Sequence, residues 1–139
     1  MKEEKKMVRK IMVVDDDPDI IFTVKEGLEL MDDEYEVISA GGGKECLEIL
    51  QRSSPPDLIV LDIMMPELSG WQVLEYLQED ENWSHIPIIF LSARTDPAAK
   101  RGGKLFGKDY IEKPFDIDDL KLRIDQVLEK KHKLHLGEQ

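Results

Sequence analysis

The amino-acid sequence predicts an α/β fold: a three-layer sandwich in which a five-stranded parallel sheet is covered by helices on both faces. Short segments rich in Val, Ile and Leu alternate with helix-like segments along the chain, and this alternation favours parallel strands joined by right-handed crossovers. Two strand-like segments, residues 58–61 and 86–91, contain no polar side chain, which is typical of central strands covered on both faces. A length of 139 residues suits one domain with its own core.

The expected strands are residues 10–14, 35–40, 58–61, 86–91 and 108–112. The first helix is expected over residues 18–31, where apolar residues recur at a helical period. Asp17 can cap this helix, and Pro18 suits its first position. The second and third helices are expected over about 44–51 and 70–79.

The last two expected helices differ in their sequence patterns. The fifth follows Asp116 and carries a regular apolar stripe, which consists of Ile117, Leu120, Ile124, Val127 and Leu128. The fourth falls within residues 97–106, where Gly102 and Gly103 each cost roughly 1 kcal/mol relative to alanine, so we expect it to be short. We divide the chain into a charged extension (1–7), one domain (8–131) and a C-terminal tail (132–139).

Composition and charge exclude several classes of function. The chain has 19 Lys and Arg against 30 Asp and Glu, so this domain is not expected to bind nucleic acid, which requires clustered basic side chains. The charged N-terminus does not resemble a secretory signal, and no segment is apolar enough to cross a membrane. Cys46 is the only cysteine, which excludes an internal disulfide. We therefore expect a cytoplasmic protein in which Cys46 serves packing.

The carboxyl ends of the expected strands carry charged and hydroxyl side chains. In chain order these are Asp15, Asp16 and Asp17 after the first strand, Asp62 after the third, Ser92 after the fourth and Lys113 after the fifth. Ligands of open parallel sheets bind at these ends. Asp17 is explained as a helix cap, but Asp15, Asp16 and Asp62 would repel one another unless a cation lay among them. Mg²⁺, which binds carboxylates, carbonyls and water, is the cofactor we expect.

Asp62 ends an apolar strand and is followed by a loop that contains Pro66 and Gly70. A carboxylate held in place can act as a nucleophile toward a phosphoryl group that a metal aligns. Lys113 can pair with Asp62 or with a phosphoryl oxygen, and the proline after it permits a cis peptide bond. Ser92 can donate its hydroxyl to another phosphoryl oxygen, although a serine after a strand is also a common turn residue.

Four segments together resemble the receiver domain of two-component response regulators. They read IMVVDDDPDI, LIVLDIMMPELSGW, IIFLSAR and DYIEKPF, and the resemblance extends from about Val8 to Lys131. It implies the flavodoxin-like receiver fold, with strand order 2-1-3-4-5 and five helices. It also implies that Asp62 accepts a phosphoryl group from a sensor histidine kinase or a phosphotransfer protein. The chain would then be a signalling switch and not an enzyme with many turnovers.

The resemblance also assigns roles to the residues of the site. Asp16 and Asp62 would bind Mg²⁺ directly, Asp15 would act mainly through water, and Met64 would contribute its backbone carbonyl. The oxygens of the phosphoryl group would be bound by Ser92 and Lys113.

The same resemblance implies a switch face formed by the fourth helix, the fifth strand and the fifth helix. Tyr110 would move between exposed and buried positions as Ser92 moves toward the phosphate, unless it only covers the edge of the core. The face would bind a downstream protein target or a second copy of the chain in a homodimer. Met64 and Arg94 occupy positions that, in the family, affect the lifetime of the phosphoryl group.

Three alternatives share parts of this pattern. An aspartate-nucleophile phosphatase of the haloacid dehalogenase type would be an enzyme, but it typically needs a second aspartate two positions after the nucleophile, where this chain has Met64. A flavodoxin-like flavin-binding protein shares the expected fold, but the acidic residues 15–17 would repel its phosphate. A degenerate receiver that only binds partners is expected to lack an acidic residue or the lysine, and both are present.

Overall fold

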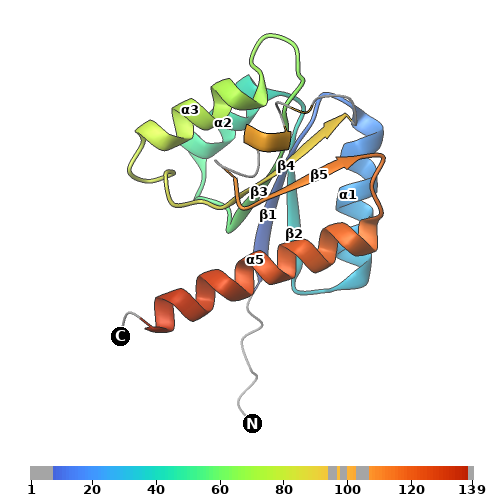
Figure 1. The fold of residues 1–139 in the computed structure, drawn as a ribbon, viewed down its shortest axis with the longest axis vertical. Helices are drawn as coiled ribbons and strands as arrows, with labels where there is room; N and C mark the ends of the chain where they lie inside the picture. Colours follow the sequence, from blue (N-terminus) through green and yellow to red (C-terminus); the bar gives the residue numbers. More distant parts are fainter. Residues whose placement is uncertain (1–7, 94–96, 98–99, 103–106, 138–139) are drawn as a thin grey trace.

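The structure is a computed structural model that describes residues 8–93, 97, 100–102 and 107–137, with side chains as far as Lys130. Five parallel strands form one sheet in the order β2-β1-β3-β4-β5. The strands are β1 (Arg9–Val14), β2 (Tyr35–Ala40), β3 (Leu58–Asp62), β4 (Ile88–Ala93) and β5 (Asp109–Lys113). The predicted fold class and strand order are therefore confirmed (Figure 1).

Helices cover both faces of this sheet (Figure 1). The helices are α1 (Pro18–Met31), α2 (Gly43–Arg52), α3 (Gly70–Glu79) and α5 (Ile117–Gly137). Buried side chains of α1 and α5 pack with one face of the strands, and those of α2 and α3 pack with the other. All residues of β3 are buried, as expected for a central strand covered on both sides.

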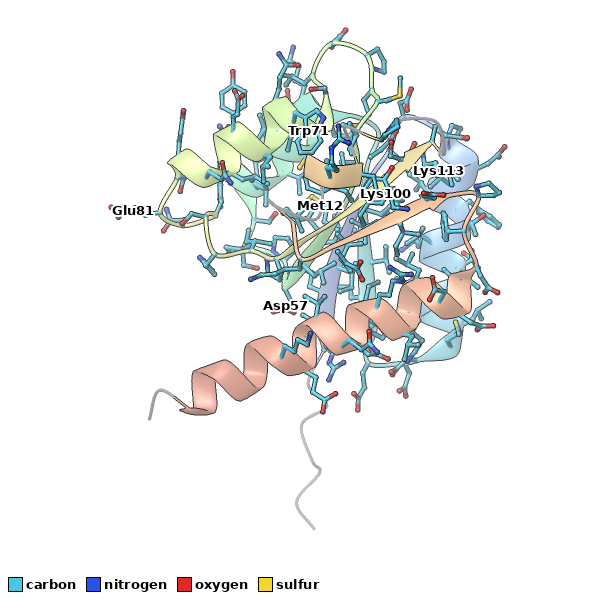
Figure 2. All side chains as sticks on the ribbon, in the orientation of Figure 1. Met12, Asp57, Trp71, Glu81, Lys100 and Lys113 are labelled. Atoms are coloured by element: carbon cyan, nitrogen blue, oxygen red, sulfur yellow. The ribbon has the colours of Figure 1, made fainter. Side chains whose placement is uncertain are left out.

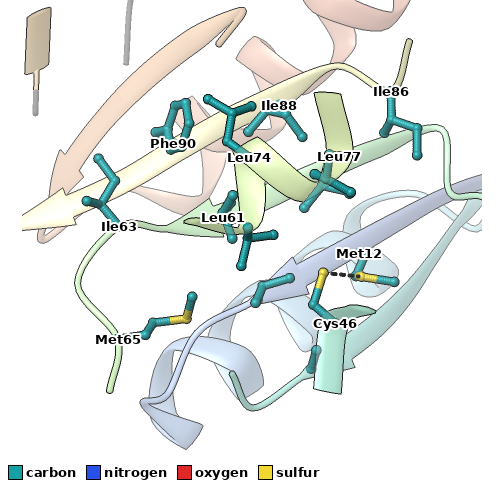
Figure 3. Close-up of a cluster of buried hydrophobic side chains, with 14 of the residues drawn as sticks. Met12, Cys46, Leu61, Ile63, Met65, Leu74, Leu77, Ile86, Ile88 and Phe90 are labelled. Atoms are coloured by element: carbon teal, nitrogen blue, oxygen red, sulfur yellow. Dashed lines mark hydrogen bonds between the residues drawn. The ribbon is translucent and has the colours of Figure 1, made fainter. Parts of the chain in front are cut away.

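The cluster beneath α2 and α3 contains Cys46, as expected for a packing role. The Cys46 side chain is buried, and its Sγ lies 3.7 Å from the Sδ atom of Met12 (Figure 3). Burial raises the pKa of the Cys46 thiol to about 12. The thiol is therefore protonated at neutral pH and unreactive.

The predicted first, second, third and fifth strands and the first three helices agree with the structure to within one residue at each end, whereas the fourth strand and the fifth helix differ by more. The fourth strand begins at Ile88 and not at residue 86, because Pro87 has no N–H to donate to a ladder. The fifth helix continues to Gly137, whereas we expected it to end near Lys131. No proline interrupts residues 131–136, and glycine is a common residue at a helix end.

The fourth helix is described only in part. Pro97 and residues 100–102 are helical, within the segment where we expected a short helix. Two residues named in the expectations lie outside the described residues. They are Gly103, which bears on the length of this helix, and Arg94, which bears on the lifetime of the phosphoryl group. Within the described part of the chain, no helix combines the length and the apolar character that crossing a lipid bilayer requires.

The edge strand β2 is covered by two side chains of α1. Glu29 accepts a hydrogen bond from the backbone N–H of Val37 at 3.0 Å, and Lys25 donates to the Val37 carbonyl at 3.1 Å. The two side chains also form an ion pair with each other at 3.2 Å. Both backbone groups of Val37 on the open side of the sheet are thereby satisfied.

Candidate functional site

Three acidic side chains meet at the carboxyl ends of β1 and β3. Asp15 directly follows β1, and Asp62 is the last residue of β3. These strands are neighbours in the sheet, with Val14 opposite Leu61. One carboxylate oxygen from each of Asp15, Asp16 and Asp62 lies within 4.8 Å of the others. The structure therefore brings together the three carboxylates that the sequence predicted to share a cation.

The three carboxylates differ in their exposure to solvent. Asp15 is fully buried and Asp62 is 3% exposed, whereas Asp16 is exposed. The Asp15 backbone N–H donates to Ala40 O at 3.1 Å, and its Oδ1 accepts from the Asp17 N–H at 2.9 Å. Asp17 itself caps α1 by accepting from the Asp19 N–H, as predicted. The acidic turn is thus fixed by hydrogen bonds at its first and third residues.

Lys113 brings positive charge to this cluster from the end of β5. Its Nζ atom lies 2.7 Å from Asp15 Oδ2 and 3.4 Å from Asp62 Oδ2. The peptide bond to Pro114 is cis, as the sequence permitted. Burial alone would lower the pKa of Lys113, but the hydrogen bonds and charges of Asp15 and Asp62 outweigh it, so the pKa is raised. Lys113 therefore remains an ammonium ion at neutral pH.

Asp62 has an unusual affinity for protons. Its pKa is raised from 3.8 to about 6, first because burial disfavours the charged carboxylate and second because Asp15 repels it. Lys113 and a hydrogen bond from the Met64 backbone N–H act in the opposite direction. A carboxylate perturbed by burial and by a specific charged neighbour is typical of a functional site.

Ser92 is buried on β4, the strand next to β3. It lies one residue beyond Leu91, which is the register partner of Asp62. Its hydroxyl oxygen has no hydrogen-bond partner among the described residues. A buried hydroxyl usually finds a partner, so this group is available to a ligand that enters the site.

The loop after Asp62 holds Met64 beside the carboxylates. Gly70, the first residue of α3, donates its N–H to Ile63 O at 2.8 Å. A Cβ atom at Gly70 would lie 2.4 Å from the Asp62 carbonyl oxygen, so only glycine allows α3 to start this close to the end of β3. The Met64 side chain is 63% exposed. The role of its carbonyl as a metal ligand stays a prediction.

Tyr110 is 4% exposed and belongs to the core cluster on the α2 and α3 side of the sheet. The structure shows the buried one of the two positions that we expected for a switch residue. This position also fits the simpler interpretation in which the ring covers the edge of the core, so the movement stays a prediction.

Sequence reasoning missed one contact of the site. We expected Lys113 to pair with Asp62, but its shorter contact is with Asp15. The sequence contains no direct signal for this preference, because it depends on how far the turn after β1 extends above the sheet. Lys113 therefore bridges two carboxylates and does not neutralise one of them alone.

The donor set fits the hard divalent cation that the sequence predicts. Three carboxylates converge within a few ångströms, and one of them is fully buried. Oxygen ligands of this kind suit Mg²⁺, which typically takes one or two carboxylates and keeps several waters. The single ammonium group of Lys113 leaves the cluster with net negative charge.

Asp16→Asn is expected to weaken Mg²⁺ binding about tenfold or more, because even partners outside the first ligand shell typically contribute about 10–100-fold. The fold should survive, because surface substitutions usually change stability by no more than about 0.5 kcal/mol. Titration calorimetry measures the affinity and thermal unfolding the stability. Asp17→Asn is the matched control, since asparagine also caps helices; equal Mg²⁺ affinity in the two variants would contradict the assignment.

The sequence of this chain matches a known protein family. The sequence model of the response regulator receiver domain matches residues 11–125. A probable cyclic di-GMP phosphodiesterase of Vibrio cholerae is 39% identical over 122 residues, which is 87% of this chain and 27% of that protein. The probable transcriptional regulator ycf27 of Porphyridium aerugineum is 41% identical over 120 residues, 86% of this chain and 48% of that protein. The chain thus spans less than half the length of these relatives.

Solved structures with a similar fold and sequence support the same family. The receiver domain of the Francisella response regulator 1452 has a TM-score of 0.78 and 32% identity, and the match covers 88% of this chain and 98% of that one. The chemotaxis protein CheY4 of Vibrio cholerae has a TM-score of 0.77 and 28% identity, with 86% and 98% covered. Family, fold and acidic cluster agree, and the chain belongs to the receiver domain family of two-component response regulators.

Proposed function

We propose that this chain is a phosphorylation-controlled signalling switch in which Asp62 accepts a phosphoryl group from a sensor histidine kinase or a phosphotransfer protein. The proposal rests on the charged side chains that surround Asp62. Its carboxylate shares a cluster with Asp15 and Asp16, and the Lys113 ammonium group lies 3.4 Å away. A nucleophile, an acidic metal site and a cation are thereby combined at one edge of the sheet.

Asp15, Asp16 and Asp62, with the carbonyl of Met64, would hold Mg²⁺. When bound, the ion neutralises charge on the phosphoryl group and aligns it with its acceptor. An oxygen of the Asp62 carboxylate forms the new bond to phosphorus, and the bond from phosphorus to the donor nitrogen or oxygen breaks. Lys113 and the buried hydroxyl of Ser92 bind phosphoryl oxygens, which takes Lys113 away from part of its pairing with Asp15.

Phosphorylation then changes the charge balance at the site. The phosphoryl group carries about 1.5 to 2 negative charges in place of the single charge of the carboxylate, and its strong acceptor oxygens recruit Ser92 and Lys113. In the proposed response Tyr110 changes position, and the face made by the fourth helix, β5 and α5 is altered. This face binds a downstream protein target or a second copy of the chain; it does not bind nucleic acid.

The remaining expectations belong to the same proposal. Residues 8–131 form the receiver domain, residues 1–7 and 132–139 flank it, and the protein acts in the cytoplasm as a switch and not as an enzyme with many turnovers. The two relatives named above are longer proteins, one a probable cyclic di-GMP phosphodiesterase and the other a probable transcriptional regulator. This supports a common regulatory domain whose output is set by its partners.

The test is incubation of the chain with a small phosphodonor such as acetyl phosphate, followed by intact-mass analysis. We expect one added phosphoryl mass with Mg²⁺ and none with a chelator. Asp17→Asn, which removes one charge next to the site, should still be labelled. Steady hydrolysis of many phosphomonoesters without a trapped adduct would support a phosphatase of the haloacid dehalogenase type and overturn the proposal.

A further inference from the structure

Trp71 occupies a position between the sheet and the fourth helix. It is the second residue of α3 and is only partly buried, at the margin of the core cluster. Its indole ring packs against the ring of Phe90, with the centroids 5.0 Å apart and the planes tilted by 41°. This is an ordinary geometry for an attractive aromatic pair.

The indole also lies against the fourth helix at Gly102. A Cβ atom at Gly102 would lie 2.7 Å from Trp71 Cη2 and 3.2 Å from Cζ2. No glycine among the described residues has a positive φ, so the close approach to the indole and not the backbone conformation requires glycine here. Trp71 lies next to the short helical segment that carries Lys100 (Figure 2).

Phe90 connects this contact to the functional site. Side chains two residues apart on a strand point to the same face of the sheet, so Phe90 and Ser92 share a face of β4. Phe90 is also the register partner of Tyr110 on β5. Trp71 therefore touches a strand residue that neighbours Ser92 along β4 and Tyr110 across to β5.

An ion pair also joins the fourth helix to the sheet. Lys100 Nζ lies 3.2 Å from Glu112 Oε1, and the two side chains are 49% and 35% exposed. Ion pairs as exposed as this one contribute little, because water screens them. The contact of Gly102 with Trp71 is apolar and close-packed, so a displacement of the indole must change the seating of the helix.

We propose that Trp71 is a positioning residue that couples the phosphorylation site to the fourth helix, with its indole held between Phe90 and Gly102. When Ser92 binds a phosphoryl oxygen, β4 and the ring of Phe90 shift, the indole follows, and the helix segment at Gly102 is repositioned. The inference rests on the proposed function, since it needs phosphorylation at Asp62.

The first test uses fluorescence. Trp71 and Trp83 are the only tryptophans, so in Trp83→Phe all tryptophan emission comes from Trp71. We expect phosphodonor and Mg²⁺ to change this emission in step with the phosphoryl adduct measured by mass. A full adduct with unchanged emission would overturn the inference and leave the proposed function intact; the absence of any adduct would overturn the proposed function.

The second test crowds the contact. In the Trp83→Phe background, Gly102→Ala places a methyl group against the indole and should change the Trp71 emission without phosphodonor. Gly42→Ala is the matched control, because a Cβ atom there would meet nothing within 4 Å. An emission spectrum of Gly102→Ala identical to that of Gly42→Ala would overturn the close contact on which the coupling depends.

The third test separates coupling from simple packing. Phosphorylation should change hydrogen exchange in the peptide containing Gly102 by about fivefold or more, the lower end of typical coupling between sites. Trp71→Leu should still be labelled at Asp62 but lose this change, and Trp71→Phe should keep part of it. A Trp71→Leu variant that is less stable yet shows the full exchange response would show that Trp71 only packs.

Discussion

Asp62→Asn is expected to abolish the phosphoryl adduct and, in the absence of metal, to stabilise the fold by about 2–3 kcal/mol above pH 7. The adduct is lost because an amide cannot replace the carboxylate as nucleophile. The stabilisation arises because the pKa of Asp62 rises from 3.8 to about 6 on folding. A tenfold change in acidity corresponds to about 1.36 kcal/mol, so holding this carboxylate ionised costs about 3 kcal/mol.

The dependence on pH follows from the direction of this pKa change. A carboxyl group whose pKa is higher in the folded state favours folding while it is protonated, so its contribution is fully present below about pH 4 and is lost as the pH rises through about 6. Asparagine does not titrate. The difference in stability between Asp62→Asn and the unchanged chain should therefore be near zero at about pH 4 and reach its maximum above about pH 7.

Urea denaturation in the presence of a chelator, at several pH values between these limits, measures the difference. Asp57→Asn serves as a control at the opposite end of β3. Asp57 directly precedes this strand, and its carboxylate accepts from the Lys10 N–H at 2.8 Å. If Asp62→Asn were less stable than the unchanged chain at neutral pH, the prediction that ionised Asp62 destabilises the fold would be wrong.

Lys113→Met is expected to destabilise the metal-free protein by about 3–5 kcal/mol at neutral pH, the usual cost of removing one partner from a buried ion pair. The Lys113 side chain is 21% exposed, and the side chains of its partners Asp15 and Asp62 are 0% and 4% exposed. Without the ammonium group these carboxylates repel each other in a site that water hardly reaches. The pKa of Asp62 should rise further, because Lys113 now lowers it.

The same variant should respond more strongly to Mg²⁺. The ammonium group competes with a dication for Asp15 and Asp62, so its removal should tighten Mg²⁺ binding, and saturating Mg²⁺ should recover most of the lost stability. Thermal unfolding across a Mg²⁺ titration measures both effects. Lys108→Met, on an exposed lysine just before β5, should show neither. Equal Mg²⁺ responses in the two variants would contradict competition between Lys113 and the metal for the same carboxylates.

The sequence predicted the elements of the site because each is local to a strand end. Asp15, Asp62 and Lys113 all follow or end strands, and parallel strands bring such ends to one edge. The Lys113 contact with Asp15 was not predictable in this way, since it depends on the height of a turn above the sheet. The contact of Trp71 with Gly102 was also missed, because it joins two helices whose relative position no local pattern encodes.

The element boundaries show the same division. The capping role of Asp17 could be predicted because one residue and its neighbours determine it. The start of β4 at Ile88 depends on pairing as well as on Pro87. The proline carbonyl accepts from the Ile59 N–H at 3.0 Å, but the proline has no N–H to donate, and Ile88 is the first residue with a register partner. Pairing partners are distant in the chain, so the apolar run alone extended the predicted strand two residues too far.

The pair formed by Lys25 and Glu29 above β2 has a consequence for assembly. An exposed strand edge invites a foreign strand to join the sheet, which is a common route to aggregation. Here an incoming strand would have to displace a carboxylate and an ammonium group from Val37 before it could form its own bonds. Sheet-to-sheet polymerisation is therefore opposed at this border.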